Sequence, residues 1–321
     1  MRRLLAGLTA GTFLLATAAC GSSDGSGSSD ASSGGITSVK VGIIPILDVA
    51  PIYLGQQKGI YKKHGLKVSM TAAQGGAAIV PGVVSGQFQF GFSNMTSLMI
   101  AQTQNVPVQA VVNGVASTGV DGKDFGATVV KKGSPIKSAK DLEGKKVAVN
   151  TLKNINDTTV RQSVRKAGGD PSKVKFVELA FDQMPAALDK GEIDAAMAVE
   201  PALSTIKSQG GTEIASSYVD VAKDLTVAMY FTSNQYAQKN PAVVKKFKEA
   251  TEEALKYADD HPDEVRQVLT TYTKIPSTLL PQLILPSWPA EPNLDSVRTL
   301  AKLGQEDGIY KSAPDLDKLI P

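Results

Sequence analysis

The sequence predicts an α/β protein with two lobes. Its 321 residues are more than one small core requires, and a hydrophobic content of 42% is that of an ordinary globular chain. From residue 37 onward, short β-branched segments alternate with longer amphipathic segments, which is typical of a parallel α/β sheet. The same composition excludes a fibrous or mostly disordered chain.

This alternation defines the elements that we expect before the last third of the chain. Strands are predicted at residues 39–44, 67–71, 89–92, 108–112, 146–150, 174–178, 195–199 and 213–215. Helices are predicted between them at residues 51–63, 77–85, 96–104, 158–167, 184–190 and 201–209. Two charged amphipathic helices with proline near the start follow at 241–257 and 262–272, and no long strand is expected in the tail.

The first 19 residues have the pattern of an export signal peptide. Arg2 and Arg3 form a basic start, residues 4–16 are apolar, and small residues lead to Cys20. The apolar stretch is shorter than the roughly 20 residues of a membrane-spanning helix. The run TAAC that ends at Cys20 resembles the lipobox of bacterial lipoproteins, which implies a lipid on this thiol. Thr17 stands where that pattern usually has leucine, so a plain secreted protein is the alternative.

Residues 20–36 are expected to tether the globular part to the membrane. After the lipidated Cys20, residues 21–35 contain only Gly, Ser, Asp and one Ala, too little apolar surface to offset the entropy lost on folding. A flexible chain of this length reaches roughly 20–25 Å. Signal, anchor and tether together predict a cell-envelope protein on the outer face of the cytoplasmic membrane.

The composition argues against several kinds of chemistry. The formal charge of +3 falls to +1 when Arg2 and Arg3 are removed with the signal, which gives no electrostatic reason to bind nucleic acid. The single cysteine, Cys20, excludes an internal disulfide and a cysteine-based zinc site. His64 and His261 lie far apart, without the spacing of a metal motif. We therefore expect no metal and no cofactor.

Small polar residues follow most of the predicted strands. In open α/β sheets, ligands bind at the carboxyl ends of the strands, where helix N-termini point their N–H groups at the crevice. Helix capping explains Asn94 and Asp157 equally well, and Gly75 and Gly76 fit ordinary turns. A binding site is favoured because several strand ends offer small polar groups without a bulky side chain.

Several long segments resemble one family of proteins. They are VGIIPILDVAPIYLGQQKGIYKKHGLKVSM (41–70), SGQFQFGFSN (85–94), AQTQNVPVQAVV (101–112), SPIKSAKDLEGKKVAVN (134–150), MPAALDKGEIDAAMAVEP (184–201) and NPAVVKKFKEATEEALKYADDHPDEV (240–265). In combination they resemble the substrate-binding proteins of ABC importers, in the group that includes sulfonate, taurine, nitrate and thiamine-pyrimidine binders.

The resemblance implies a type II periplasmic-binding-protein fold, in which two α/β lobes are joined by two crossing hinge strands and the ligand lies between them. We place the crossings near residues 126–131 and 226–231. Lobe 1 then comprises residues 37–126 and 230–321, and lobe 2 comprises residues 127–229. The implied cargo is a small organic solute, and the implied partner is a permease with a cytoplasmic ATPase. The chain is expected to be a monomer without enzyme activity.

The ligand contacts of the family lie at strand ends, and the resemblance transfers them to the matching positions of this chain. In lobe 1 these are Leu47, Asp48, Gly75, Gly76, Ser93, Asn94 and Asn113. In lobe 2 they are Asn150, Thr151, Asn156, Asp157, Thr158, Phe181, Asp182 and Glu200.

These positions predict a cleft with an acidic balance. Its carboxylates are Asp48, Asp157, Asp182 and Glu200, against one cation, Lys153. Helix N-termini could hold a sulfonate or nitrate there, although an anion beside unneutralised carboxylates costs free energy. A neutral or cationic nitrogen heterocycle that donates to Asp48 or Glu200 fits this inventory better. The alternative is that the aspartates cap helices or face solvent.

Three other residues have competing explanations. Arg161 lies one helical turn after Asp157, so a surface ion pair between them is expected. Trp288 is expected to anchor a C-terminal loop to lobe 1 rather than stack on a ligand. Phe181 is the best stacking candidate, because it follows a predicted strand.

Two other functions remain open at this point. A ligand-loaded sensor that docks on a membrane receptor would have the same sequence features. Relatives of the fold include a pyrimidine synthase, but export and the loss of the thiol to lipidation argue against an enzyme. His64 near a helix end and His261 between two helices have structural explanations as well.

Overall fold

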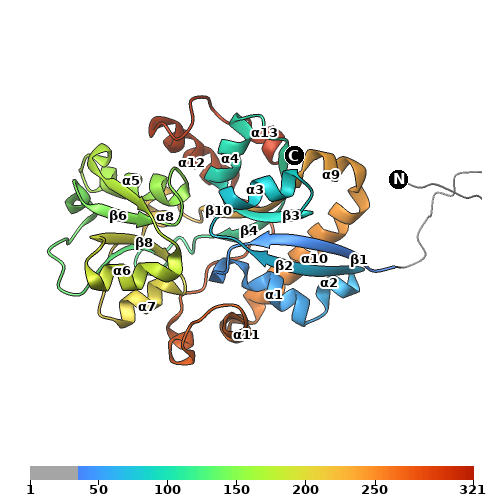
Figure 1. Ribbon diagram of the computed structural model, residues 1–321, viewed down its shortest axis with the longest axis horizontal. Helices are drawn as coiled ribbons and strands as arrows, with labels where there is room; N and C mark the ends of the chain where they lie inside the picture. The colour runs from blue at the N-terminus through green and yellow to red at the C-terminus, as the bar shows by residue number, and fades with distance from the viewer. Residues whose placement is uncertain (1–34) are drawn as a thin grey trace, which may run out of the picture. The chain divides into compact units, whose positions relative to one another are not determined.

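A computed structural model describes residues 35–321 of the chain (Figure 1). The predicted export signal, the lipidation site at Cys20 and nearly all of the tether lie outside the described residues. In the described part of the chain, no helix is long and apolar enough to cross a membrane. Residues 36–321 form one compact unit that contains two sheets, each covered by helices.

The first sheet has the strand order β2-β1-β3-β10-β4. Strands β1 (Thr37–Ile43) and β2 (Leu66–Ala72) pair in parallel along their whole length. Strand β3 (Phe90–Asn94) is also parallel to β1, and β4 (Val108–Ala116) and β10 (Thr226–Ser233) complete the sheet. The carboxyl ends of β1 and β3 therefore lie at the same edge of the sheet.

Helices connect these strands as the sequence alternation predicts. They are α1 (Ala50–Gln57), α2 (Ile60–Lys63), α3 (Gly76–Val84) and α4 (Met95–Thr103), with α9 (Asn234–Lys239), α10 (Pro241–Asp260) and α11 (Pro262–Val268) after β10. The helix predicted at 51–63 is two helices, because Gly59 has a φ of 72° in the left-handed region.

The second sheet has the strand order β7-β6-β8-β5-β9. Its strands are β5 (Gly126–Val130), β6 (Lys146–Val149), β7 (Lys175–Glu178), β8 (Ala195–Val199) and β9 (Thr212–Ala215). Strand β6 is parallel to both β7 and β8. The helices of this lobe are α5 (Ile155–Lys166), α6 (Met184–Lys190), α7 (Ala202–Ser208) and α8 (Ser217–Val221).

The segments in which we placed the crossings form strands β5 and β10, and each is paired inside one sheet. Both strands run antiparallel to their neighbours. Strand β10 is antiparallel to β3 and β4, and β5 is antiparallel to β8 and β9, so both sheets are mixed rather than purely parallel. All of β10 is buried and paired in the first sheet, although the predicted lobe boundary at residue 230 falls inside it. The chain thus passes between the sheets in residues 117–125 and 222–225.

The C-terminal residues join the two lobes instead of forming a separate unit. Helix α12 (Leu294–Glu306) packs against α4 of the first lobe and α5 of the second, and α13 (Leu316–Leu319) packs on α4 and β4. Helix α10 covers the first sheet through Phe247, which is fully buried and stacks on Phe90 with ring centroids 3.8 Å apart.

Replacing Phe247 by alanine should lower the free energy of unfolding by about 3–5 kcal/mol, because the change leaves a cavity between α10 and the sheet. Chemical denaturation of the purified protein measures this difference. Lys246→Ala, an exposed position on the same helix, should change it by less than about 0.5 kcal/mol. Equal stability of the Phe247→Ala variant and the wild type would contradict the packing described here.

Candidate functional site

The carboxyl ends of strands from both sheets meet at one small cavity. Its volume is about 20 Å³, which is room for about one water molecule. Isoleucine, valine and alanine side chains form much of the wall. The polar and aromatic residues that line it are Asp48, Phe92 and Asn94 from the first lobe and Asn150, Asn156, Phe181 and Tyr218 from the second.

A larger hollow of about 210 Å³ lies at the opposite edge of the second sheet. It is lined by residues that include Lys131 and Lys132, just after β5, and both lysines are exposed. None of the predicted strand-end residues lines this hollow. The smaller cavity between the lobes is therefore the candidate site.

Asp48 lies in a short 3₁₀ turn (Leu47–Val49) that follows β1. Its side chain is buried at 3% exposure, and within residues 35–321 its Oδ1 has no hydrogen-bond partner. Burial, opposed by a hydrogen bond from the residue's own backbone N–H and assisted by repulsion from Asp124, raises the pKa of Asp48 to about 7. Since solvation no longer stabilises the charge, this carboxylate requires a donor or a cation to remain ionised.

Main-chain contacts hold the Asp48 turn in place. The indole Nε1 of Trp288 donates to the carbonyl of Asp48 at 3.1 Å, and the hydroxyl of Tyr272 donates to the carbonyl of Ile46 at 3.0 Å. The Trp288 side chain is buried at 2% exposure and does not line the cavity, so it anchors the loop as predicted.

Three asparagines supply the amide groups of the site. Asn94 caps α4, where its Oδ1 accepts from the Ser97 N–H at 2.9 Å. The Oδ1 of Asn150, just after β6, accepts from the Asn156 side chain at 3.0 Å and from that of Asn154 at the same distance. Because the amide oxygens of Asn94 and Asn150 already accept hydrogen bonds, these two side chains mainly offer N–H donors.

Tyr218 belongs to the site, although the sequence did not indicate it. It lies in α8, just before the second passage between the sheets, and its hydroxyl donates to Asn156 Oδ1 at 2.9 Å. It lies three residues after β9, which ends at Ala215, and the set of strand ends considered in the sequence did not include this one. Burial raises its pKa well above the usual value, and the tyrosine stays neutral as a hydrogen-bond donor.

Five of the residues expected at the site line this cavity, and the others lie around it. The five are Asp48, Asn94, Asn150, Asn156 and Phe181. Asp182 is exposed, so it faces away from the cavity. Asn113 is buried, does not line the cavity, and donates to the carbonyl of Pro289 at 2.7 Å. Leu47, Ser93 and Thr158 are fully buried and pack inside their lobes.

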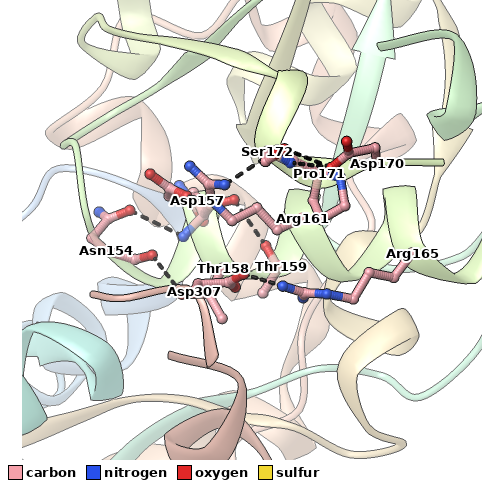
Figure 2. A network of polar contacts seen from close by, with 11 residues as sticks. Asn154, Asp157, Thr158, Thr159, Arg161, Arg165, Asp170, Pro171, Ser172 and Asp307 are labelled. Carbon is pink, nitrogen blue, oxygen red and sulfur yellow. Dashed lines mark hydrogen bonds and ion pairs between the residues drawn. The ribbon is translucent and has the colours of Figure 1, made fainter. Parts of the chain in front are cut away.

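Asp157 takes part in a network of hydrogen bonds and ion pairs on the second lobe (Figure 2). Arg161 pairs with Asp157 one helical turn away and donates to the carbonyl of Pro171 at 3.1 Å. The predicted i,i+4 pair is thus confirmed, but Asp157 is buried, so the pair does not lie on the surface as expected. In the same view, Arg165 of α5 pairs with Asp307, which follows α12, so this ion pair joins α5 to the C-terminal segment.

Glu200 holds the lobes together outside the cavity, rather than lining it as expected. Its side chain is fully buried just after β8, and its carboxylate accepts from Ser204 N at 2.9 Å and Ser204 Oγ at 2.8 Å. The same carboxylate accepts from the N–H of Ile284 at 3.2 Å. The main-chain carbonyl of Glu200 accepts from the N–H of Leu47, also at 3.2 Å. Both of these donors lie outside the second lobe.

Gly75 and Gly76 each lie where a side chain would collide with a neighbouring residue, Gly75 with one in the other lobe and Gly76 with one in its own lobe. A Cβ on Gly75 would lie 2.4 Å from Oγ1 of Thr151 in the other lobe. A Cβ on Gly76 would lie 2.0 Å from Ser93 Oγ and 2.9 Å from its Cα, inside the first lobe. The first glycine therefore permits the lobes to meet, and the second permits α3 to pack on β3.

The charge of the cavity comes from Asp48. In the described part of the chain, no lysine or arginine lines it, and Lys153, Asp157, Asp182 and Glu200 do not line it either. Within residues 35–321, no group of three acidic or histidine side chains could hold a metal ion. The site can accept hydrogen bonds at Asp48 and donate them from the amides.

Gly75→Ala should hold the lobes apart, because the new methyl group meets Thr151 before they close. Small-angle X-ray scattering should show a larger radius of gyration than for the wild type. Adding Thr151→Ala should restore the smaller value, since the threonine Cβ would be an ordinary 3.7 Å away. Gly76→Ala should instead destabilise the first lobe. An unchanged radius for Gly75→Ala would contradict this account.

The protein should become less stable as the pH rises from about 4.5 through 7. Burial raises the pKa of Asp48 and of Glu200 to about 7 in each case, although hydrogen bonds from Ser204 and Ile284 favour the charged form of Glu200. The folded state binds more protons than the unfolded state in that range, so each group contributes about 1.4 kcal/mol per pH unit.

Denaturant titrations at pH 5 and 8 measure this loss of stability. Asp48→Asn and Glu200→Gln should each flatten the dependence, and Asp189→Asn, an exposed position on α6, should leave it unchanged. The assignment for Asp48 would be refuted if the difference in unfolding free energy between the wild type and Asp48→Asn were the same at pH 5 and at pH 8.

Comparisons with known proteins agree with this architecture. The chain is 28% identical over 202 residues to a taurine-binding periplasmic protein of Escherichia coli, a match that covers 63% of this chain and 61% of that protein. It is 28% identical over 279 residues to a putative ABC transporter periplasmic binding protein of Brachyspira hyodysenteriae, covering 84% and 78%. The solved alkanesulfonate-binding protein of Xanthomonas axonopodis superposes with a TM-score of 0.74 over 89% of this chain and 99% of that one, at 15% identity.

One relative is named as an enzyme. It is the 4-amino-5-hydroxymethyl-2-methylpyrimidine phosphate synthase of Aspergillus parasiticus, 23% identical over 66% of this chain and 64% of that protein. This chain shares its fold with the solved alkanesulfonate-binding protein. The NMT1/THI5-like family pattern matches residues 47–265, more than half of the chain, and the protein belongs to that family.

Proposed function

We propose that the protein is the extracytoplasmic solute-binding component of an ABC importer. It captures a small organic solute between its two lobes and delivers the solute to a permease driven by a cytoplasmic ATPase. The observation that carries this proposal is the convergence of strand ends from both sheets on one buried cavity that contains amides and one carboxylate. The names of the taurine-binding and ABC-transporter relatives support it.

Capture by closure follows from the contacts between the lobes. Gln74 Nε2 donates to the carbonyl of Asn150 at 3.4 Å, and Glu200 binds Leu47 and Ile284 across the gap. A cavity of about 20 Å³ does not admit an organic solute, so the lobes separate for entry and close on the solute afterwards. Closure completes a site that neither lobe holds alone.

The lipid at Cys20 and the tether to residue 36 belong to the same proposal. They would keep a monomer near its permease on the outer face of the cytoplasmic membrane. A ligand-loaded sensor on a membrane receptor would use the same closed form, and genes for a permease and an ATPase beside this one would distinguish the importer.

A synthase-like enzyme is the weaker alternative. His64 is bound to Glu253 at 2.8 Å and His261 stacks on Tyr257 at 3.9 Å, and neither histidine lines the cavity. Among the residues of the described chain that line the cavity, Asp48 is the only candidate for a general base, and none is a candidate nucleophile. We therefore propose binding and transport without covalent chemistry.

A thermal-denaturation screen of the full chain in detergent tests the proposal, with sulfonates, nitrate, taurine, pyrimidines and small amines. A solute at 100 times its Kd should raise the free energy of unfolding by about 2.7 kcal/mol. Asn94→Ser in the first lobe and Asn156→Ala in the second should each reduce the shift, since closure needs both lobes. The proposal fails if both variants are stabilised by the solute as much as the wild type is, or if the protein converts the solute to another product.

A further inference from the structure

The carboxylate of Asp48 has no evident role in holding the fold together. The turn that carries it is fixed by contacts to main-chain atoms, from Trp288, Tyr272 and the carbonyl of Glu200. Within residues 35–321 the Asp48 Oδ1 has no partner, although the side chain is buried. A buried acceptor without a donor costs roughly 1–3 kcal/mol, and a buried charge without a partner costs more.

The groups around Asp48 do not neutralise its charge. Its own backbone N–H favours the charged form but carries no full charge; the charged neighbour that acts on it is Asp124, which repels, and the nearby Tyr218 and Tyr272 are neutral. In the part of the chain that the structure describes, neither lysine nor arginine lines the cavity. A positive charge at this carboxylate must therefore come from the solute.

The amides that line the cavity have the opposite polarity to Asp48. The side-chain oxygens of Asn94 and Asn150 accept bonds from Ser97 and from two neighbouring amides. In residues 35–321 the amide nitrogens of these two asparagines donate no hydrogen bond, so they can donate to an acceptor group on a solute. Asn94 caps α4, whose N-terminus also favours negative charge, and Asn150 directly follows β6.

We propose that Asp48 is the counter-ion for a protonated nitrogen of the solute, which makes the solute a small organic amine that also carries a hydrogen-bond acceptor group. This inference rests on the proposed solute-binding function and specifies its substrate class. Aminosulfonates and short amino acids have this chemistry, with an ammonium for Asp48 and an anionic group for the amides. The small cavity favours short molecules.

Isothermal titration calorimetry of the full chain with matched pairs tests the assignment. Taurine and isethionate differ only in an ammonium replaced by a hydroxyl, and β-alanine and 3-hydroxypropionate differ in the same way. The amine of at least one pair should bind, and its hydroxyl analogue should bind at least tenfold more weakly. Asp48→Asn should remove this preference, whereas Asp189→Asn, with an exposed carboxylate on α6, should keep it.

The melting temperature of the free Asp48→Asn variant at pH 8 is the control for folding. It should equal or exceed that of the wild type, because the change removes an unpaired buried charge. Equal affinity for both members of a pair, or an Asp48→Asn variant that keeps the amine preference, overturns the assignment. Binding of nitrate, cytosine or an amine-free sulfonate, without binding of any amine, also overturns it but leaves the solute-binding function standing.

Discussion

Glu200 is the residue on which the closed arrangement of the lobes depends. It follows β8 of the second sheet, yet it accepts hydrogen bonds from Leu47 and Ile284, which belong to segments packed on the first sheet. Leu47 immediately precedes Asp48, so the contact that joins the lobes also fixes the main chain next to the charged residue of the cavity. A buried carboxylate with both oxygens hydrogen-bonded is costly to separate from its donors, and this makes closure specific.

The charges of the second lobe are arranged so that they do not reach the cavity. Arg161 and Asp157 neutralise each other on α5, and Arg165 pairs with Asp307 beyond α12 (Figure 2). Burial raises the pKa of Asp307, and the guanidinium beside it opposes that shift. These pairs leave Asp48 as the isolated charge of the site. The electrostatics of the cavity therefore depend on a single charged side chain, with amides as its counterpart.

Much of the fold followed from local sequence patterns. The alternation of β-branched and amphipathic segments predicted nearly every strand and helix up to β9, because side-chain periodicity reflects burial on one face. It did not predict that β5 and β10 run against their neighbours, since strand direction depends on pairing between distant segments. The divided helix at 51–63 could have been foreseen from Gly59, which favours a left-handed turn.

The sequence by itself determined the elements, the likeness to a solute-binding family and a set of polar strand ends, because these depend on neighbouring residues and on motifs. Only the tertiary structure decided which strand ends share one cavity. It assigned Asp48 to the site and Glu200 to the contact between the lobes, although both carboxylates follow buried strands. It also added Tyr218 from α8. A residue's partners depend on how the two lobes pack, and that packing is set by contacts between segments far apart in the chain.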